Sequence, residues 1–111
     1  LKGNKKSYQM DFRNNFEALR EVALDIKEGA DVVMVKPGMP YLDIIKSIKE
    51  NFKIPVFAYQ VSGEYSLIKN GINNKIISEE SIEESLVSFK RAGATAIVTY
   101  FALEIAKKLK N

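Results

Sequence analysis

Each of three short apolar runs in the chain ends near a side chain that can do chemistry. Lys36 follows the first run, Tyr59 and Ser62 lie around the end of the second, and Tyr100 follows the third. Burial disfavours the charged form of a lysine, and the neutral amine is the nucleophile that attacks a ketone to form a Schiff base. Phenol and hydroxyl groups donate hydrogen bonds to a carboxylate or carbonyl oxygen. The four residues therefore predict a small-molecule site with Lys36 as its nucleophile.

Each of these residues also has a simpler structural interpretation. Lys36 can extend its amine to solvent from the end of a strand. Ser62 and Tyr100 can hydrogen-bond to neighbouring backbone, and Tyr59 can pack in a core, because tyrosine is common in strands. Position in the sequence alone leaves both interpretations open.

Composition removes several other kinds of site. The 111 residues include no cysteine and no histidine, so the chain offers no thiolate, no imidazole base and no cysteine-based zinc site. Apolar residues make up 46% and charged residues 28%, as in ordinary globular proteins. The net charge is +3, and its lysines are spread among acidic residues, with concentrated runs only at the two ends. This distribution favours solvated termini over a nucleic-acid surface. The sequence contains no apolar run of membrane-spanning length and no nucleotide-binding glycine motif.

The elements that must position these side chains alternate between helix and strand. Strands are expected over residues 31–35, 55–61 and 94–99, because these runs are apolar without alternation, as in strands buried on both faces. Long helices are expected over residues 14–28, 41–51, 78–92 and 102–108, with a short helix ending at Ile68 and a loop over 71–78. In the first helix, the spacing predicts an apolar stripe of Phe16, Leu19, Ala23 and Ile26.

This order predicts an α/β fold of parallel βα units, with any ligand at the carboxyl ends of the strands. Two architectures remain open at this point, an open doubly wound sheet and part of a (β/α)8 barrel. A complete barrel needs about 250 residues.

Motifs along the chain match those of one known family. Two of them are highly specific, Met34-Val-Lys-Pro37 and Val61-Ser-Gly-Glu-Tyr65. Further matching segments, in the family order and spacing, are Lys5–Met10, Glu17–Glu21, Tyr41–Ile44, Glu84–Leu86, Lys90–Ala94 and Thr99–Ala102. With these motifs the sequence resembles the porphobilinogen synthase (5-aminolevulinic acid dehydratase) family. The resemblance implies that residues 1–111 are the C-terminal portion of a single (β/α)8 TIM-barrel catalytic domain.

The resemblance also implies a lyase that condenses two molecules of 5-aminolevulinate to porphobilinogen with loss of water, in haem and other tetrapyrrole synthesis. Lys36 matches the lysine that forms a Schiff base with the substrate destined for the propionate side of the product. Ser62 and Tyr100 match residues that hold the carboxylate of that substrate, and Tyr59 matches an aromatic residue of the same pocket. Gln9 matches a residue at the carboxylate of the second substrate.

The remaining implications concern charge, metals and assembly. Lys5 stands where the family usually has arginine, so it offers the second substrate a positive charge without a bidentate fork. Glu21 matches a glutamate that binds an allosteric magnesium in some members, although it also fits an ordinary helix-surface carboxylate. Ligands for a zinc ion would lie outside this chain. The family implies a homo-oligomer, commonly an octamer, in the cytoplasm or a plastid, with no nucleic-acid or membrane partner.

Two alternatives accompany this interpretation. Another aldolase-like barrel would also use a strand-end lysine, but the matches at Val61–Tyr65 and Thr99–Ala102 argue against it. A second hypothesis, from a different class, is a catalytically incompetent piece that only associates through exposed strand edges.

Overall fold

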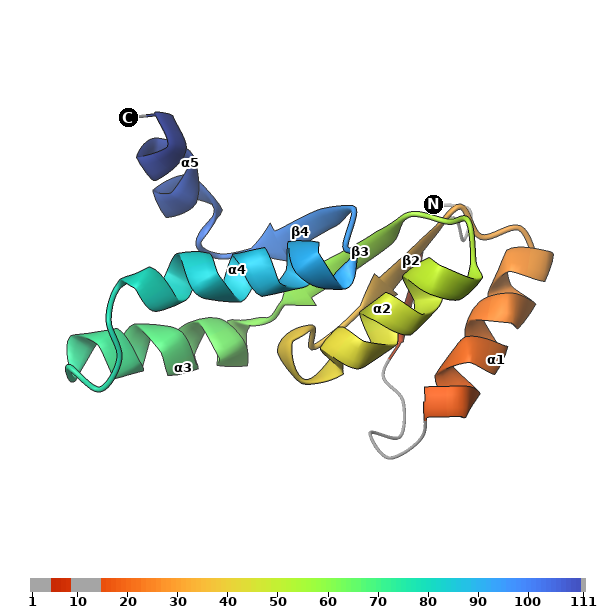
Figure 1. Cartoon of the computed structure of the whole chain (residues 1–111), viewed down its shortest axis with the longest axis horizontal. Helices are drawn as coiled ribbons and strands as arrows, with labels where there is room; N and C mark the ends of the chain where they lie inside the picture. The colour runs from red at the N-terminus through yellow and green to blue at the C-terminus, as the bar shows by residue number, and fades with distance from the viewer. Residues whose placement is uncertain (1–4, 9–14, 111) are drawn as a thin grey trace.

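The computed structural model describes residues 5–8 and 15–110, with the side chains of residues 15–109. Its elements are, in chain order, β1 (Lys5–Tyr8), α1 (Asn15–Lys27), β2 (Val32–Val35), the 3-10 turn η1 (Met39–Tyr41), α2 (Leu42–Asn51), β3 (Val56–Gln60), α3 (Ser62–Asn73), α4 (Glu80–Ala92), β4 (Ala96–Thr99) and α5 (Ala102–Lys110). The four strands form one parallel sheet in the order β1-β2-β3-β4 (Figure 1).

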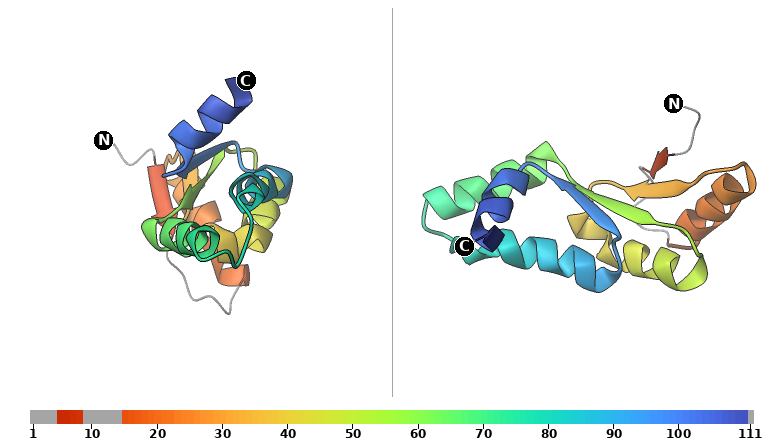
Figure 2. Two further views of the ribbon diagram at one scale, coloured as in Figure 1. Left: turned by 90° about the vertical axis from the view of Figure 1, so that its left-hand side faces the viewer. Right: turned by 90° about the horizontal axis from the view of Figure 1, so that it is seen from above.

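Helices α1, α2 and α4 cover one face of this sheet, as the right-hand view of Figure 2 shows. Helix α3 continues beyond the end of β3, and α5 leads away from the sheet toward the C-terminus (Figure 1). Consecutive strands are neighbours and every strand runs in the same direction. This arrangement brings the carboxyl ends of β2, β3 and β4 to the same end of the sheet, as the sequence predicts.

The main core lies between the sheet and the three covering helices. Alternate strand residues point to opposite faces of a sheet, and those that face the helices here are buried, among them Val33, Val35, Val56 and Ala58. The helices contribute these fully buried side chains: Val22, Ile45, Ile48 and Phe89. A smaller cluster forms between α3, α4 and α5, where Ile68, Ile82 and Phe101 are buried.

Glycines end two of the helices where the sequence predicts them. Gly29 after α1 and Gly93 after α4 have φ angles of 101° and 119°, the left-handed region that glycine adopts without steric cost. The backbone N–H of Gly93 returns to the carbonyl of Phe89 at 3.2 Å and to that of Lys90 at 3.0 Å. At the start of α4, the Ser78 hydroxyl accepts the backbone N–H of Glu80 at 3.2 Å.

The apolar stripe predicted for the first helix is wrong in part. Phe16 is 82% exposed and Ala23 is exposed, whereas Ala18 and Val22 face the core. Both side chains belong to the main core cluster. Leu19 and Ile26 then flank the contact, partly buried against the core.

Two elements differ from the sequence-based expectation. Strand β1 was not expected, because Lys5–Tyr8 is polar and lacks the apolar run of the other strands. The helix expected to end at Ile68 continues to Asn73, so the predicted loop over 71–78 begins after this residue. The extension is stabilised because Ile72 packs against the Ile68 cluster and the Asn74 side chain bonds to the carbonyl of Asn70 at 2.8 Å.

Candidate active site at the carboxyl ends of the strands

The strand register places three of the predicted site residues on one face of the sheet. Val35 pairs with Ala58, so Lys36 and Tyr59 are the next pair of positions along β2 and β3. Tyr59 in turn pairs with Val98 of β4, two residues before Tyr100. Because the period of a strand is two, Tyr59 projects from the face opposite the helices, and continuing β2 and β4 by one residue puts Lys36 and Tyr100 on that same face. Lys36 and Tyr59 are half-buried there, and Tyr100 is 55% exposed.

Tyr59 and Tyr100 interact directly on this face. A hydrogen bond with the Tyr100 hydroxyl, followed by electrostatic repulsion and burial, raises the pKa of the Tyr59 phenol. The Tyr100 ring also lies 5.5 Å from the ring of Tyr65, whose other neighbour is Phe101 at 4.5 Å. The two phenols therefore sit together at the level where β3 and β4 end.

The segment after Lys36 is fixed by close backbone packing. The N–H of Gly38 donates to the carbonyl of Tyr59 at 2.9 Å, which continues the contact between β2 and β3 past the last paired residues. A Cβ at Gly38 would lie 2.5 Å from the Phe89 ring and 3.3 Å from the backbone carbonyl oxygen of Tyr59. The backbone can take this path only because position 38 has no side chain. The Lys36–Pro37 peptide bond is cis.

A glutamate that sequence reasoning did not select also belongs to this site. Glu64, in the first turn of α3, accepts the backbone N–H of Met39 at 2.8 Å and that of Val61 at 3.0 Å. Burial raises the pKa of the Glu64 carboxyl, and the backbone N–H groups of Met39, Val61 and Gly38 act in the opposite direction. Glu64 is part of the Val61–Tyr65 motif, but its role in the site depends on a contact with Met39, a residue far away in sequence.

Ser62, Lys5 and Gln9 are the other residues predicted to bind substrate. Ser62 is exposed at the start of α3, on the same rim of the sheet. Lys5 belongs to β1 and pairs with Val32, but its side chain lies outside the described residues, as does all of Gln9. The structure therefore brings Lys36, Tyr59, Ser62 and Tyr100 together at the carboxyl end of the sheet.

Glu21 lies apart from the carboxyl end of the sheet, exposed on α1. Within residues 5–8 and 15–110, no group of three or more histidine, cysteine, aspartate or glutamate side chains comes together as a metal site. A single exposed carboxylate is less than the ligand set that holds a magnesium ion. The described residues therefore do not by themselves form a site for that metal.

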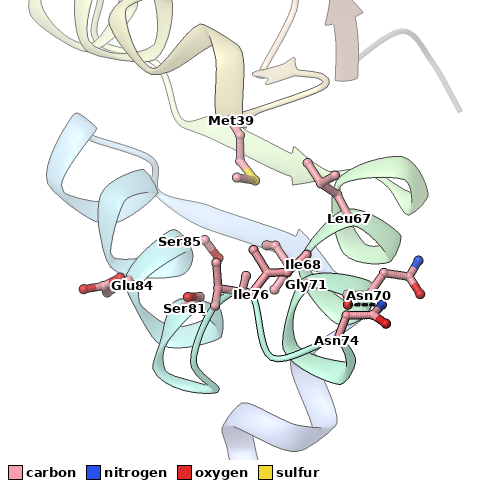
Figure 3. Close-up of a pocket in the computed structure, with 11 residues that line it drawn as sticks. Met39, Leu67, Ile68, Asn70, Gly71, Asn74, Ile76, Ser81, Glu84 and Ser85 are labelled. Carbon is pink, nitrogen blue, oxygen red and sulfur yellow. Dashed lines mark hydrogen bonds between the residues drawn. The ribbon is translucent and has the colours of Figure 1, made fainter.

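A separate cavity lies between α3, α4 and the loop that joins them, and Figure 3 shows its lining. Its volume is about 600 Å³, and Leu67, Ile68, Ile76 and Ile77 supply much of its wall. Glu84 is the one charged residue of that lining, and no amine is present. The cavity is therefore not a candidate for the chemistry predicted for Lys36. In the described part of the chain, no helix combines the length and apolar character of a membrane span.

The fold and the residues at the carboxyl ends of its strands define a class of protein. In this class, parallel βα units carry a lysine amine and tyrosine phenols at those ends. The chain belongs to the Delta-aminolevulinic acid dehydratase family, whose model matches residues 1–108. It is 57% identical over 108 residues to the Delta-aminolevulinic acid dehydratase of Archaeoglobus fulgidus, covering 97% of this chain and 34% of that protein. The chloroplastic enzyme of Pisum sativum is 55% identical over 108 residues, with 96% and 27% covered.

A solved structure confirms the fold class. The chain matches a crystal structure of delta-aminolevulinic acid dehydratase (porphobilinogen synthase) from Toxoplasma gondii ME49, in complex with the reaction product porphobilinogen. The TM-score is 0.86 at 52% identity, with 90% of this chain and 29% of that chain covered. The parallel units are thus part of a (β/α)8 barrel, and the alternative of an open doubly wound sheet is wrong. The chain spans about a third of the length of the relatives it matches, between 27% and 34% for those named here.

Proposed function

We propose that the protein to which this chain belongs is a porphobilinogen synthase, a lyase that condenses two molecules of 5-aminolevulinate to porphobilinogen with loss of water. One observation carries the proposal: Lys36, Tyr59 and Tyr100 share the face of the sheet opposite the helices, at the carboxyl ends of adjacent strands. That is where the ligands of barrel proteins bind. Membership of the family supports the same activity.

In this proposal the unprotonated Nζ of Lys36 attacks the ketone carbon of one 5-aminolevulinate. A carbon–nitrogen bond forms, the carbonyl oxygen leaves as water after proton transfer, and a protonated imine remains. The imine withdraws electrons from the adjacent carbon and so assists carbon–carbon bond formation with the second molecule. Because both substrates are held on one protein, a bimolecular step becomes effectively intramolecular.

The hydroxyl groups on the rim have a binding role in this scheme. Ser62 and Tyr100 donate hydrogen bonds to the carboxylate of the first substrate, and Tyr59 forms part of the wall of the same pocket. Gln9 and Lys5 would face the carboxylate of the second substrate. The family match and the position of Ser62 and Tyr100 on one rim support the assignment of the first pair.

Metal, assembly and location complete the proposal. Glu21 would supply one carboxylate to an allosteric magnesium ion whose other ligands come from outside the described residues, and zinc ligands would also lie outside this chain. We further propose a homo-oligomer, an octamer as is common in the family, located in the cytoplasm or in a plastid. The chloroplastic names of plant relatives support the second location.

The hypothesis of an incompetent piece keeps one specific observation in its favour. In the order β1-β2-β3-β4, the described sheet has β1 and β4 at its edges. Four strands do not close a barrel, which needs about eight, and open edges are templates for association with other strands. We therefore propose that residues 1–111 alone are inactive and that the activity belongs to a longer chain.

Trapping of the imine tests the proposal. The protein is purified at its native length and its mass is measured, since 12.5 kDa would identify the 111-residue chain alone. It is then mixed with 5-aminolevulinate, reduced with borohydride and mapped by peptide mass spectrometry. We expect a reduced adduct on Lys36, lost in Lys36→Met and kept in Lys46→Met, an exposed lysine paired with Glu50. In protein about three times heavier, the absence of an adduct on Lys36 would contradict its role, whether or not another residue is modified.

A further inference from the structure

The carboxylate of Glu64 joins the two segments that carry predicted site residues. Its Oε2 accepts the backbone N–H of Met39 at 2.8 Å, and its Oε1 accepts the backbone N–H of Val61 at 3.0 Å. Met39 follows Lys36 closely, and Val61 directly precedes Ser62. One half-buried carboxylate therefore holds the end of β2 and the start of α3 together.

Helix capping alone does not explain this arrangement. A glutamate in the first turn satisfies the N–H of the capping residue with one oxygen. The second oxygen of Glu64 reaches Met39, which is 25 residues away in sequence. An ionised carboxylate can accept at both oxygens, whereas an amide has one acceptor and would turn its NH₂ group toward another donor. The double contact thus specifically suits a carboxylate.

The position of Met39 ties this contact to Lys36. Between them stand Pro37, which has no N–H to donate, and Gly38, whose N–H bonds to the carbonyl of Tyr59 at 2.9 Å. The first two N–H groups that anchor the segment after Lys36 are therefore those of Gly38 and Met39. The Tyr59 contact is a backbone contact that many sequences would keep, but the Met39 contact depends on the Glu64 side chain.

We infer that Glu64 is a positioning residue for Lys36, which holds the β2 end so that the lysine amine is aimed at the substrate carbonyl. The inference rests on the proposed function, because it requires Lys36 to be the nucleophile. A displacement of the attacking atom by about 1 Å costs on the order of 100-fold in rate. Glu64 does not touch the substrate in this account, and a glutamine can keep the capping bond to Val61 beside Ser62. The loss of the Met39 contact should therefore appear in the rate of attack rather than in substrate affinity.

The test compares wild type with Glu64→Gln at native chain length, in timed borohydride quenches over a series of 5-aminolevulinate concentrations. The reduced Lys36 peptide is quantified and divided by the folded fraction measured by circular dichroism. We expect the rate of adduct formation at saturation to fall roughly 10- to 100-fold, while the half-saturating concentration changes by less than about threefold. Glu50→Gln, an exposed glutamate on α2, is the matched control and should keep the wild-type rate.

The outcomes separate the inference from the proposed function. A wild type that forms no Lys36 adduct would overturn the proposed function. A wild type that forms the adduct, with Glu64→Gln reacting at the same rate per folded molecule, would overturn the positioning role and leave a purely structural one. If Glu64→Gln does not fold, Glu64→Asp decides, because aspartate keeps the charge but is too short to span both N–H groups. A lowered rate in that variant supports the inference, and an unchanged rate contradicts it.

Discussion

The hydroxyl of Thr99 donates a hydrogen bond to the side-chain oxygen of Gln60 at 2.6 Å, which joins β4 to β3 inside the protein. Gln60 is fully buried, and its amide nitrogen donates to the hydroxyl of Ser85 on α4 at 2.9 Å. The Thr99 oxygen also accepts the backbone N–H of Phe101 at 3.1 Å. This pair of side chains therefore fixes the turn at which Tyr100 leaves the sheet.

Replacement of Thr99 by valine should destabilise the protein by about 1–3 kcal/mol, the cost of leaving buried polar groups unsatisfied. Valine has nearly the same shape, but it gives no donor to the Gln60 oxygen and no acceptor to the Phe101 N–H. The free energy of unfolding is measured by urea titration. Ser66→Ala, which removes a hydroxyl from the exposed side of α3, is the control and should change stability little. Equal stability of Thr99→Val and wild type would show that the network adds nothing.

Removal of the Tyr100 hydroxyl should lower the pKa of Tyr59 toward its ordinary value. The hydrogen bond with Tyr100 is the largest cause of the raised pKa, and Tyr100→Phe abolishes it. Tyrosinate absorbance is followed against pH in wild type, Tyr100→Phe and Tyr59→Phe, so that the signal of Tyr59 is identified by difference. An unchanged titration of Tyr59 in Tyr100→Phe would contradict the contact.

The same pair should make stability fall in alkaline solution. A phenol whose folded pKa is raised contributes stability that is complete below its unfolded pKa of about 10 and is lost as the pH rises through the folded value. Thermal unfolding of wild type and Tyr59→Phe, measured from neutral pH into this range, checks the sign. Wild type should lose stability relative to Tyr59→Phe as the pH rises.

An alanine at Gly38 should be costly because the added methyl has no room. Its Cβ would lie 2.5 Å and 2.9 Å from two atoms of the Phe89 ring. Overpacking of this kind costs about 1–3 kcal/mol, measured by urea unfolding. Gly63→Ala is a matched control, since nothing lies within 4 Å of a Cβ at that position. Gly38→Ala combined with Phe89→Leu should cost less than the sum of the two single changes, because leucine vacates the space; strict additivity would argue against the contact.

The carboxyl of Glu64 should make stability fall as the pH rises from acidic values. Burial raises its folded pKa, so its contribution is complete below the unfolded value of about 4.3 and is lost as the pH rises through the folded value. The amide introduced by Glu64→Gln is neutral throughout, so wild type should lose stability relative to this variant over the interval. Urea midpoints of both proteins at a series of pH values provide the measurement. A difference that stays constant, or changes in the opposite sense, would show that the backbone N–H groups outweigh burial.

Local patterns in the sequence predicted most of the secondary structure. Apolar runs without alternation marked β2, β3 and β4, and glycines marked the ends of α1 and α4. Strand β1 was not predicted because Lys5–Tyr8 lacks the apolar run of the other strands, and only its parallel pairing with β2 identifies it. The length of α3 was not predicted because Gly71 resembles a helix end, whereas packing of Ile72 stabilises the helix beyond Gly71.

The sequence by itself determined the family, the class of fold and the strand-end residues Lys36, Tyr59, Ser62 and Tyr100, because these depend on residue types and short-range spacing. Only the tertiary structure decided which of them share a face, since that follows from the register between strands. It also decided the partners of Glu64 and Gln60. Those contacts join residues 25 and 39 positions apart, and a pattern within one element carries no information on a hydrogen bond between two.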